Sequence, residues 1–110
     1  MSKKKIYHRH LKKGKYYWHY DDSTKGKHPS LIYKKNDKKN RYHVVCFTTS
    51  EGKGRKLLNK NIDPKSKEPC YVLNRPRIAK RKTFSSELVG FKITDKQDKA
   101  RVRRIENKKK

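Results

Sequence analysis

The sequence predicts a small, mainly β domain, an antiparallel barrel that ends in one helix and carries basic tails. Three observations support this prediction. The chain has 110 residues, the length of a single domain. Hydrophobic residues make up only 30% of it, so the core must be small and built mainly from strands. The apolar segments are short and rich in β-branched and aromatic residues, as is typical of strands.

The stretch from Arg41 to Thr49 predicts the central strand of this domain. It is the longest nearly uncharged run in a chain of which 40% is charged. Its apolar residues do not alternate with polar ones, which indicates burial on both faces of a sheet. The hydroxyls of Thr48 and Thr49 stand where the strand enters a loop. That position suits either a functional site or simple capping of the strand end.

Strands are also predicted before this segment. Residues 15–20 and 28–33 are rich in aromatic and β-branched side chains. Charged turns at residues 21–27 and 34–40 join them to the central strand as an antiparallel meander. Pro29 would begin the second strand, where a proline removes no ladder hydrogen bond.

The segments after the central strand predict a loop and three further strands. Residues 51–68 predict a mobile basic loop, with a short helical turn at Leu57 and Leu58. Residues 69–73 predict the next strand. A basic edge strand follows at residues 77–81 and a turn at residues 83–88. Residues 89–94 predict the last strand.

The C-terminal part predicts one helix. It runs from Asp95 to Ile105, and Thr94 or Asp95 can cap its first turn. The folded domain is therefore expected to span residues 14–105. Residues 1–13 are expected to form a basic N-terminal arm, and residues 106–110 a basic C-terminal tail.

Charge is the strongest indication of a partner. Lys and Arg total 34 against 10 Asp and Glu, a formal net charge of +24. Self-repulsion of this size is relieved when the chain binds a polyanion, and we expect that polyanion to be RNA. An acidic protein is a further candidate partner. A membrane is not expected as a partner, because no helix has a broad apolar face and no apolar run reaches about 18 residues. The lack of a secretory signal leads us to expect a cytoplasmic location.

The sequence does not predict a metal site or a cofactor. Cys46 and Cys70 lie in predicted strands and are expected to be small core residues. Two cysteines and five scattered histidines do not fall at zinc-binding spacings. The adjacent Asp21 and Asp22 offer too few oxygen ligands for a hard metal ion.

The candidate nucleic-acid-binding residues are cations of the basic segments and two residues of the first strand. Alternation places Tyr16, Trp18 and Tyr20 on one face of that strand and Tyr17 and His19 on the other. One face can pack into the core and the other can stack on unpaired bases, and we assign stacking to Tyr17 and His19. The full set is Tyr17, His19, Arg41, Lys53, Arg55, Lys56, Arg75, Arg77, Lys80, Arg81, Arg101, Arg103 and Arg104.

Three segments carry a resemblance to a known family. Residues 26–32 read GKHPSLI, residues 44–50 read VVCFTTS and residues 69–73 read PCYVL. In this order they resemble strands of the MazF/PemK family of toxin endoribonucleases, over about residues 14–105. The resemblance implies a compact, SH3-like barrel and cleavage of RNA without a metal ion.

The same resemblance implies candidate catalytic residues. In that family an Arg just before the proline and a Thr in the later strand carry cleavage, and these positions hold His28 and Thr48 or Thr49 here. His28 is a departure, because a histidine can act as a general acid or base but cannot give the permanent bidentate charge of an arginine. Arg77 or Arg41 would then have to clamp the phosphate. A fold that binds RNA without cutting it is the alternative.

Three functions fit these features. The first is a metal-independent endoribonuclease or its non-cutting relative. The second is a non-enzymatic inhibitor encoded by a mobile element, which binds a structured RNA or a ribonucleoprotein such as a CRISPR effector with its guide RNA. The third is a ribosome-associated protein. Convergence of His28 with Thr48 or Thr49 would favour the first, whereas a diffuse basic face without a pocket would favour the others.

Overall fold

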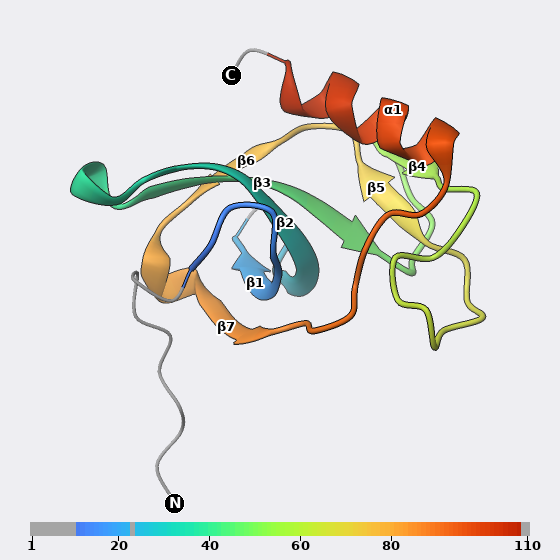
Figure 1. Cartoon of the computed structure of the whole chain (residues 1–110), viewed down its shortest axis with the longest axis horizontal. Helices are drawn as coiled ribbons and strands as arrows, with labels where there is room; N and C mark the ends of the chain where they lie inside the picture. Colours follow the sequence, from blue (N-terminus) through green and yellow to red (C-terminus); the bar gives the residue numbers. More distant parts are fainter. Residues whose placement is uncertain (1–10, 23, 109–110) are drawn as a thin grey trace, which may run out of the picture.

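The chain folds as one curved antiparallel sheet with a helix laid against it near the C-terminus (Figure 1). This computed structural model describes residues 11–22 and 24–108. The mainly β prediction with one C-terminal helix is confirmed. The regular elements in chain order are β1 (Tyr16–Asp21), β2 (Gly26–Asn36), η2 (Asp37–Lys39), β3 (Arg41–Thr48), β4 (Arg55–Leu57), β5 (Tyr71–Leu73), β6 (Arg77–Ala79), η3 (Arg81–Thr83), β7 (Phe84–Glu87) and α1 (Lys96–Glu106).

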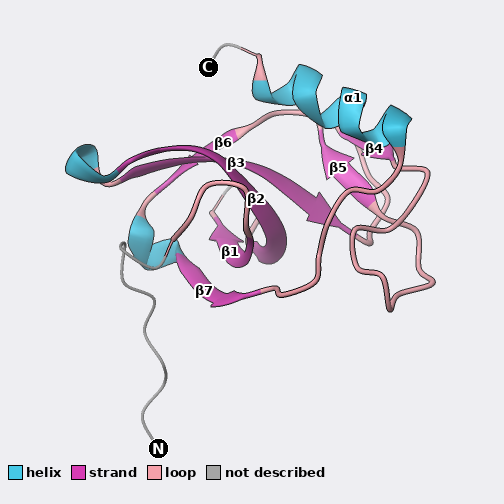
Figure 2. Cartoon of the chain, in the orientation of Figure 1, coloured by secondary structure: helices cyan, strands magenta, loops and turns pink. Residues whose placement is uncertain are grey.

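The sheet is organised around β3. Its strand order is β4-β5-β3-β2-β1-β7, and β6 pairs with β3 off this path. The meander of the first three strands is confirmed, since β1 pairs antiparallel with β2 and β2 with β3. Figure 2 shows β2 and β3 running together as a long hairpin to the short helical turn η2 at its tip.

Burial on both faces of β3 is also confirmed. Val44, Val45, Cys46 and Phe47 are all fully buried. Successive side chains point to opposite faces of a strand, so these four residues contribute to two separate cores. The first core contains Leu11, Tyr17, Ile32, Tyr42, Val44, Cys46, Leu73, Ala79 and Phe84. The second contains Tyr16, Val45, Phe47, Leu58, Ile62, Cys70, Val72, Val102 and Ile105.

The helix α1 covers the second core, and hydrogen bonds join its first turn to the loop that follows β4. Asp95 caps the helix as predicted, because its side chain accepts a hydrogen bond from the backbone N of Asp98. The Asp98 carboxylate is itself fully buried and accepts from the backbone N of Asn59 at 2.8 Å and of Lys60 at 3.0 Å. These bonds fix the residues that follow β4 against the helix.

Two predicted elements differ from the structure. Residues 55–57 are strand β4 rather than a loop with a helical turn, because they pair with β5. The last strand is β7 at Phe84–Glu87, not residues 89–94. Residues 88–95 instead form an irregular segment that turns at Gly90, where φ is +89°. Its apolar side chains pack against the second core rather than pairing in a ladder.

The fold extends further toward both termini than expected. Residues 1–10 of the predicted arm lie outside the described residues, but Leu11 is fully buried in the first core. At the other end α1 continues to Glu106, and Nζ of Lys108 bonds the carbonyl oxygen of Asn74 at 2.9 Å.

Cys46 and Cys70 are buried core residues, as predicted. Within the described part of the chain, no helix has both the length and the apolar character needed to cross a membrane.

Candidate functional site

The two aromatic residues predicted to stack on bases lie in the core, so that assignment is wrong. Tyr17 is 1% exposed and His19 is 3% exposed. Phe84 of β7 covers both, with ring centroids at 6.2 Å from Tyr17 and 5.1 Å from His19. The exposed aromatic side chains of β1 are instead Trp18 and Tyr20, on the other face of the strand.

Four of the predicted cations converge in one hollow of about 330 Å³, which we name the basic groove. Among the described residues, no carboxylate lines it. Gly54, with φ at +76°, turns the chain into β4, and its carbonyl oxygen accepts from the backbone N of Asn74. This bond holds the two loops of the groove together. The lining residues are Thr24, Lys53, Gly54, Arg55, Leu73, Asn74, Arg75 and Arg77.

Protein acceptors hold two of the guanidinium groups in place. Nε of Arg77 lies 3.3 Å from Oδ2 of Asp21, a nearly buried carboxylate. Nη1 of Arg55 donates to the carbonyl oxygen of Ser50 at 2.9 Å. A guanidinium carries five N–H donors, so such bonds fix its position and leave other donors to bind an anion.

His28 lies behind the basic groove and is only 7% exposed. Its Nε2 is 2.7 Å from Oγ1 of Thr24. Burial lowers the pKa of His28, Asp21 opposes this, and the positive charges of Arg55 and Arg77 lower it further. The imidazole is therefore neutral at pH 7.

The predicted catalytic residues share a second hollow, of about 220 Å³, which we name the aromatic cavity. His28, Thr48 and Thr49 all line it. Thr24 lines the basic groove and contacts His28, which lines the aromatic cavity, so the two hollows adjoin at this contact. The full lining is Trp18, Lys27, His28, Pro29, Phe47, Thr48, Thr49, Asn61, Ile62, Asp63, Ser66, Glu68, Cys70 and Phe91.

The two predicted phosphate clamps are not equivalent. Arg77 lines the basic groove beside His28. Arg41 begins β3, seven residues before Thr48, and at about 3.3 Å per residue this places it roughly 20 Å from the strand end. Arg41 is therefore too far away to act at the same phosphate.

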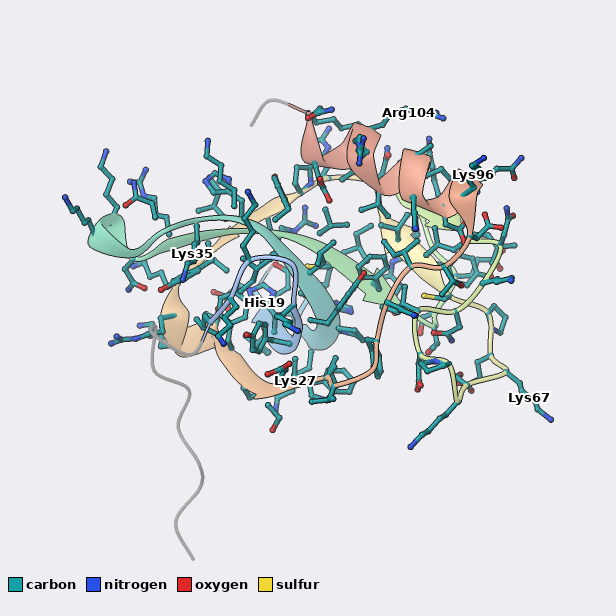
Figure 3. All side chains as sticks on the ribbon, in the orientation of Figure 1. His19, Lys27, Lys35, Lys67, Lys96 and Arg104 are labelled. Atoms are coloured by element: carbon teal, nitrogen blue, oxygen red, sulfur yellow. The ribbon has the colours of Figure 1, made fainter. Side chains whose placement is uncertain are left out.

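The remaining predicted cations divide between a third hollow and the outer surface. The third hollow lies between β4 and α1 and is lined by Lys56, Leu57, Asn59, Arg101 and Arg104. Nη1 of Arg101 donates to the carbonyl oxygen of Leu57 there. Figure 3 shows Lys96 and Arg104 on the helix, well separated from Lys35 on the β2–β3 hairpin. Of the predicted cations, those that line none of these three hollows are Arg41, Lys80, Arg81 and Arg103.

Sequence reasoning missed Thr24 and Asp21 as parts of the site. Oγ1 of Thr24 lies 3.2 Å from Oδ2 of Asp21, and it also contacts His28. The only sequence signal is that the turn 21–27 joins β1 to the strand that carries His28. In the described part of the chain, no group of three or more His, Cys, Asp and Glu side chains is placed to hold a metal ion.

Comparison of the chain with protein-family models, with curated proteins and with solved structures finds no match.

Proposed function

We propose that this protein binds RNA and that the basic groove holds phosphates of its backbone. The observation that carries the proposal is the convergence of Lys53, Arg55, Arg75 and Arg77 in one hollow that no carboxylate of residues 11–22 and 24–108 lines. Cations that are fixed before binding lose little side-chain entropy when a phosphate arrives. The net charge of +24 draws a polyanion to the surface from a distance.

The shape of the basic surface favours a single strand of RNA. The cations face into a hollow rather than along a flat face, and a single strand can bend into a hollow where a stiff duplex cannot. β4 then connects the groove to the hollow beside α1, because Arg55 lines the first and Lys56 the second. A strand held at both places would follow β4. Free RNA and RNA within a ribonucleoprotein present the same phosphates to this surface.

The relation to the MazF/PemK family is part of the proposal. In this view the curved sheet is an SH3-like barrel of that type, which retains RNA binding with His28 in place of the arginine. Nε2 of His28 is engaged by Oγ1 of Thr24, and the residue is only 7% exposed. A general base must reach the proton that it removes, either directly or through one water. The engagement of His28 therefore supports binding without cleavage.

A binding titration tests the proposed function. Fluorescence anisotropy of a labelled single-stranded RNA should show saturable binding at physiological salt. Binding should weaken when groove cations are removed and persist when equally exposed cations elsewhere are removed. Equal loss in both sets of variants would contradict a role for the groove, and no binding at all would contradict RNA as the partner.

A further inference from the structure

The aromatic cavity differs in chemistry from the basic groove beside it. In the described part of the chain, the charged residues that line the cavity are one cation, Lys27, and two carboxylates, Asp63 and Glu68, whereas those of the groove are four cations and no carboxylate. A phosphate would meet carboxylates in the cavity, so its ligand is not a phosphate. The ligand of the cavity is therefore an uncharged group, such as a neutral part of the same polymer.

The walls of the cavity suit a flat ring. Trp18 pairs with Pro29 across β1 and β2, and Phe47 lies one step beyond the paired Ser30 and Cys46 on the neighbouring strand. Together with Phe91, these side chains give the cavity apolar and aromatic walls. Its volume of about 220 Å³ is below the roughly 300–1,000 Å³ of sites for drug-sized ligands, and suits a single ring system.

The rim of the cavity is polar, and hydrogen bonds within the protein fix its position. Asn61 donates to the carbonyl oxygen of Glu68 at 3.0 Å and accepts from the backbone N of Asp63 at 2.9 Å. The backbone N of Lys92 donates to the carbonyl oxygen of Ile62, which joins this loop to the segment that carries Phe91. Amide, hydroxyl and carboxylate groups on such a rim can pair with the donor and acceptor edge of a nucleobase.

We propose that the aromatic cavity binds one unpaired nucleobase of the RNA whose phosphates lie in the basic groove. This inference rests on the proposed function. The two hollows adjoin at the Thr24–His28 contact, so a base and its own phosphate can occupy them together. The groove then supplies affinity that does not depend on the base, and the cavity supplies the part that does.

The test compares two oligomers of equal length and charge: a single-stranded RNA octamer, and a chain of eight abasic ribose phosphates. Both should bind, and the octamer should bind roughly 5- to 150-fold more tightly because stacking adds to the phosphate contacts. Trp18 is the only tryptophan of the chain, so its fluorescence reports on the cavity without any substitution. It should change with the octamer and stay constant with the abasic chain.

Two variants localise the effect. Thr49→Phe places a ring at an exposed position of the cavity lining and should remove the preference for the octamer while keeping the affinity for the abasic chain. Tyr20→Ala is the control. It removes an exposed ring of β1, the strand that carries Trp18, but Tyr20 does not line the cavity, so the preference for the octamer should remain.

Equal affinity of the wild-type protein for both oligomers, or a preference that survives in Thr49→Phe, would overturn the cavity assignment but leave phosphate binding standing. Binding of neither oligomer would overturn the proposed function and this inference together.

Discussion

Oγ1 of Thr24 lies 2.7 Å from Nε2 of His28 and 3.2 Å from Oδ2 of Asp21. One hydroxyl thus connects the histidine at the aromatic cavity to the carboxylate that holds Arg77 in the basic groove. The contact also occupies one of the two ring nitrogens that could accept a proton. In the proposed function, this small network holds His28 and Arg77 in fixed positions at the two hollows.

The first prediction concerns cleavage. A labelled single-stranded RNA incubated with the wild-type protein in the presence of a metal chelator should remain intact, because His28 is nearly buried and its Nε2 contacts Oγ1 of Thr24. Gel electrophoresis of the RNA checks this. Cleavage by the wild type that disappears in His28→Ala would show that His28 takes part in RNA cleavage and would contradict the prediction.

The second prediction concerns the ion pair beneath the groove. Arg77→Gln leaves the nearly buried Asp21 carboxylate without its charged partner and should lower the free energy of unfolding by about 1–3 kcal/mol. Arg75→Gln is the matched control. Arg75 is exposed and contributes only its backbone oxygen to Arg77, so its loss should change stability by less than about 0.5 kcal/mol. Urea denaturation measures both.

A double substitution distinguishes a charge effect from a packing effect at the same pair. Adding Asp21→Asn to Arg77→Gln removes the uncompensated charge and should recover part of the lost stability. If the double variant is no more stable than Arg77→Gln alone, the carboxylate charge is not the cause of the loss.

The third prediction concerns the stability of the fold at acid pH. Burial lowers the pKa of His19 to about 4 from an ordinary value of 6.5, so the unfolded chain binds the proton more readily between these pH values. Stability should therefore fall as the pH is lowered from 6.5 toward 4, by about 3 kcal/mol from this group, and the effect should level off below pH 4.

The control for this prediction is His19→Gln. Urea midpoints measured across the same pH range should be less pH-dependent in His19→Gln than in the wild type. An identical slope in the two proteins would mean that His19 is not responsible for the acid sensitivity.

The main strands were predictable because their patterns are local. The uncharged run of β3 indicated burial on both faces, and the turns around β2 set the order of the meander. A helix cap at Thr94 or Asp95 was predictable from the position of these residues before the periodic segment, and Asp95 is the one that caps it. In each of these cases the residues that determine the element lie within it or beside it.

The site was less predictable because it depends on long-range contacts. Alternation along β1 separated Tyr17 and His19 from Trp18 but could not show which face Phe84 would cover. Arg77 and Asp21 are far apart in the chain and meet only after β6 pairs with β3. The charge of the chain indicated a polyanion, but only the fold separates groove cations such as Arg55 from outlying ones such as Arg41.

The central claim is that groove cations neutralise RNA phosphates, and its most direct test is the salt dependence of affinity. Four neutralised phosphates on a single strand predict a slope of log affinity against log salt of about −2.8 or steeper. Lys53→Gln with Arg75→Gln should make it shallower by about 1.4. Lys38→Gln with Lys39→Gln, an equal charge change at the hairpin tip, should leave it nearly unchanged. A wild-type slope shallower than about −1, or equal shifts in both double variants, would contradict the account.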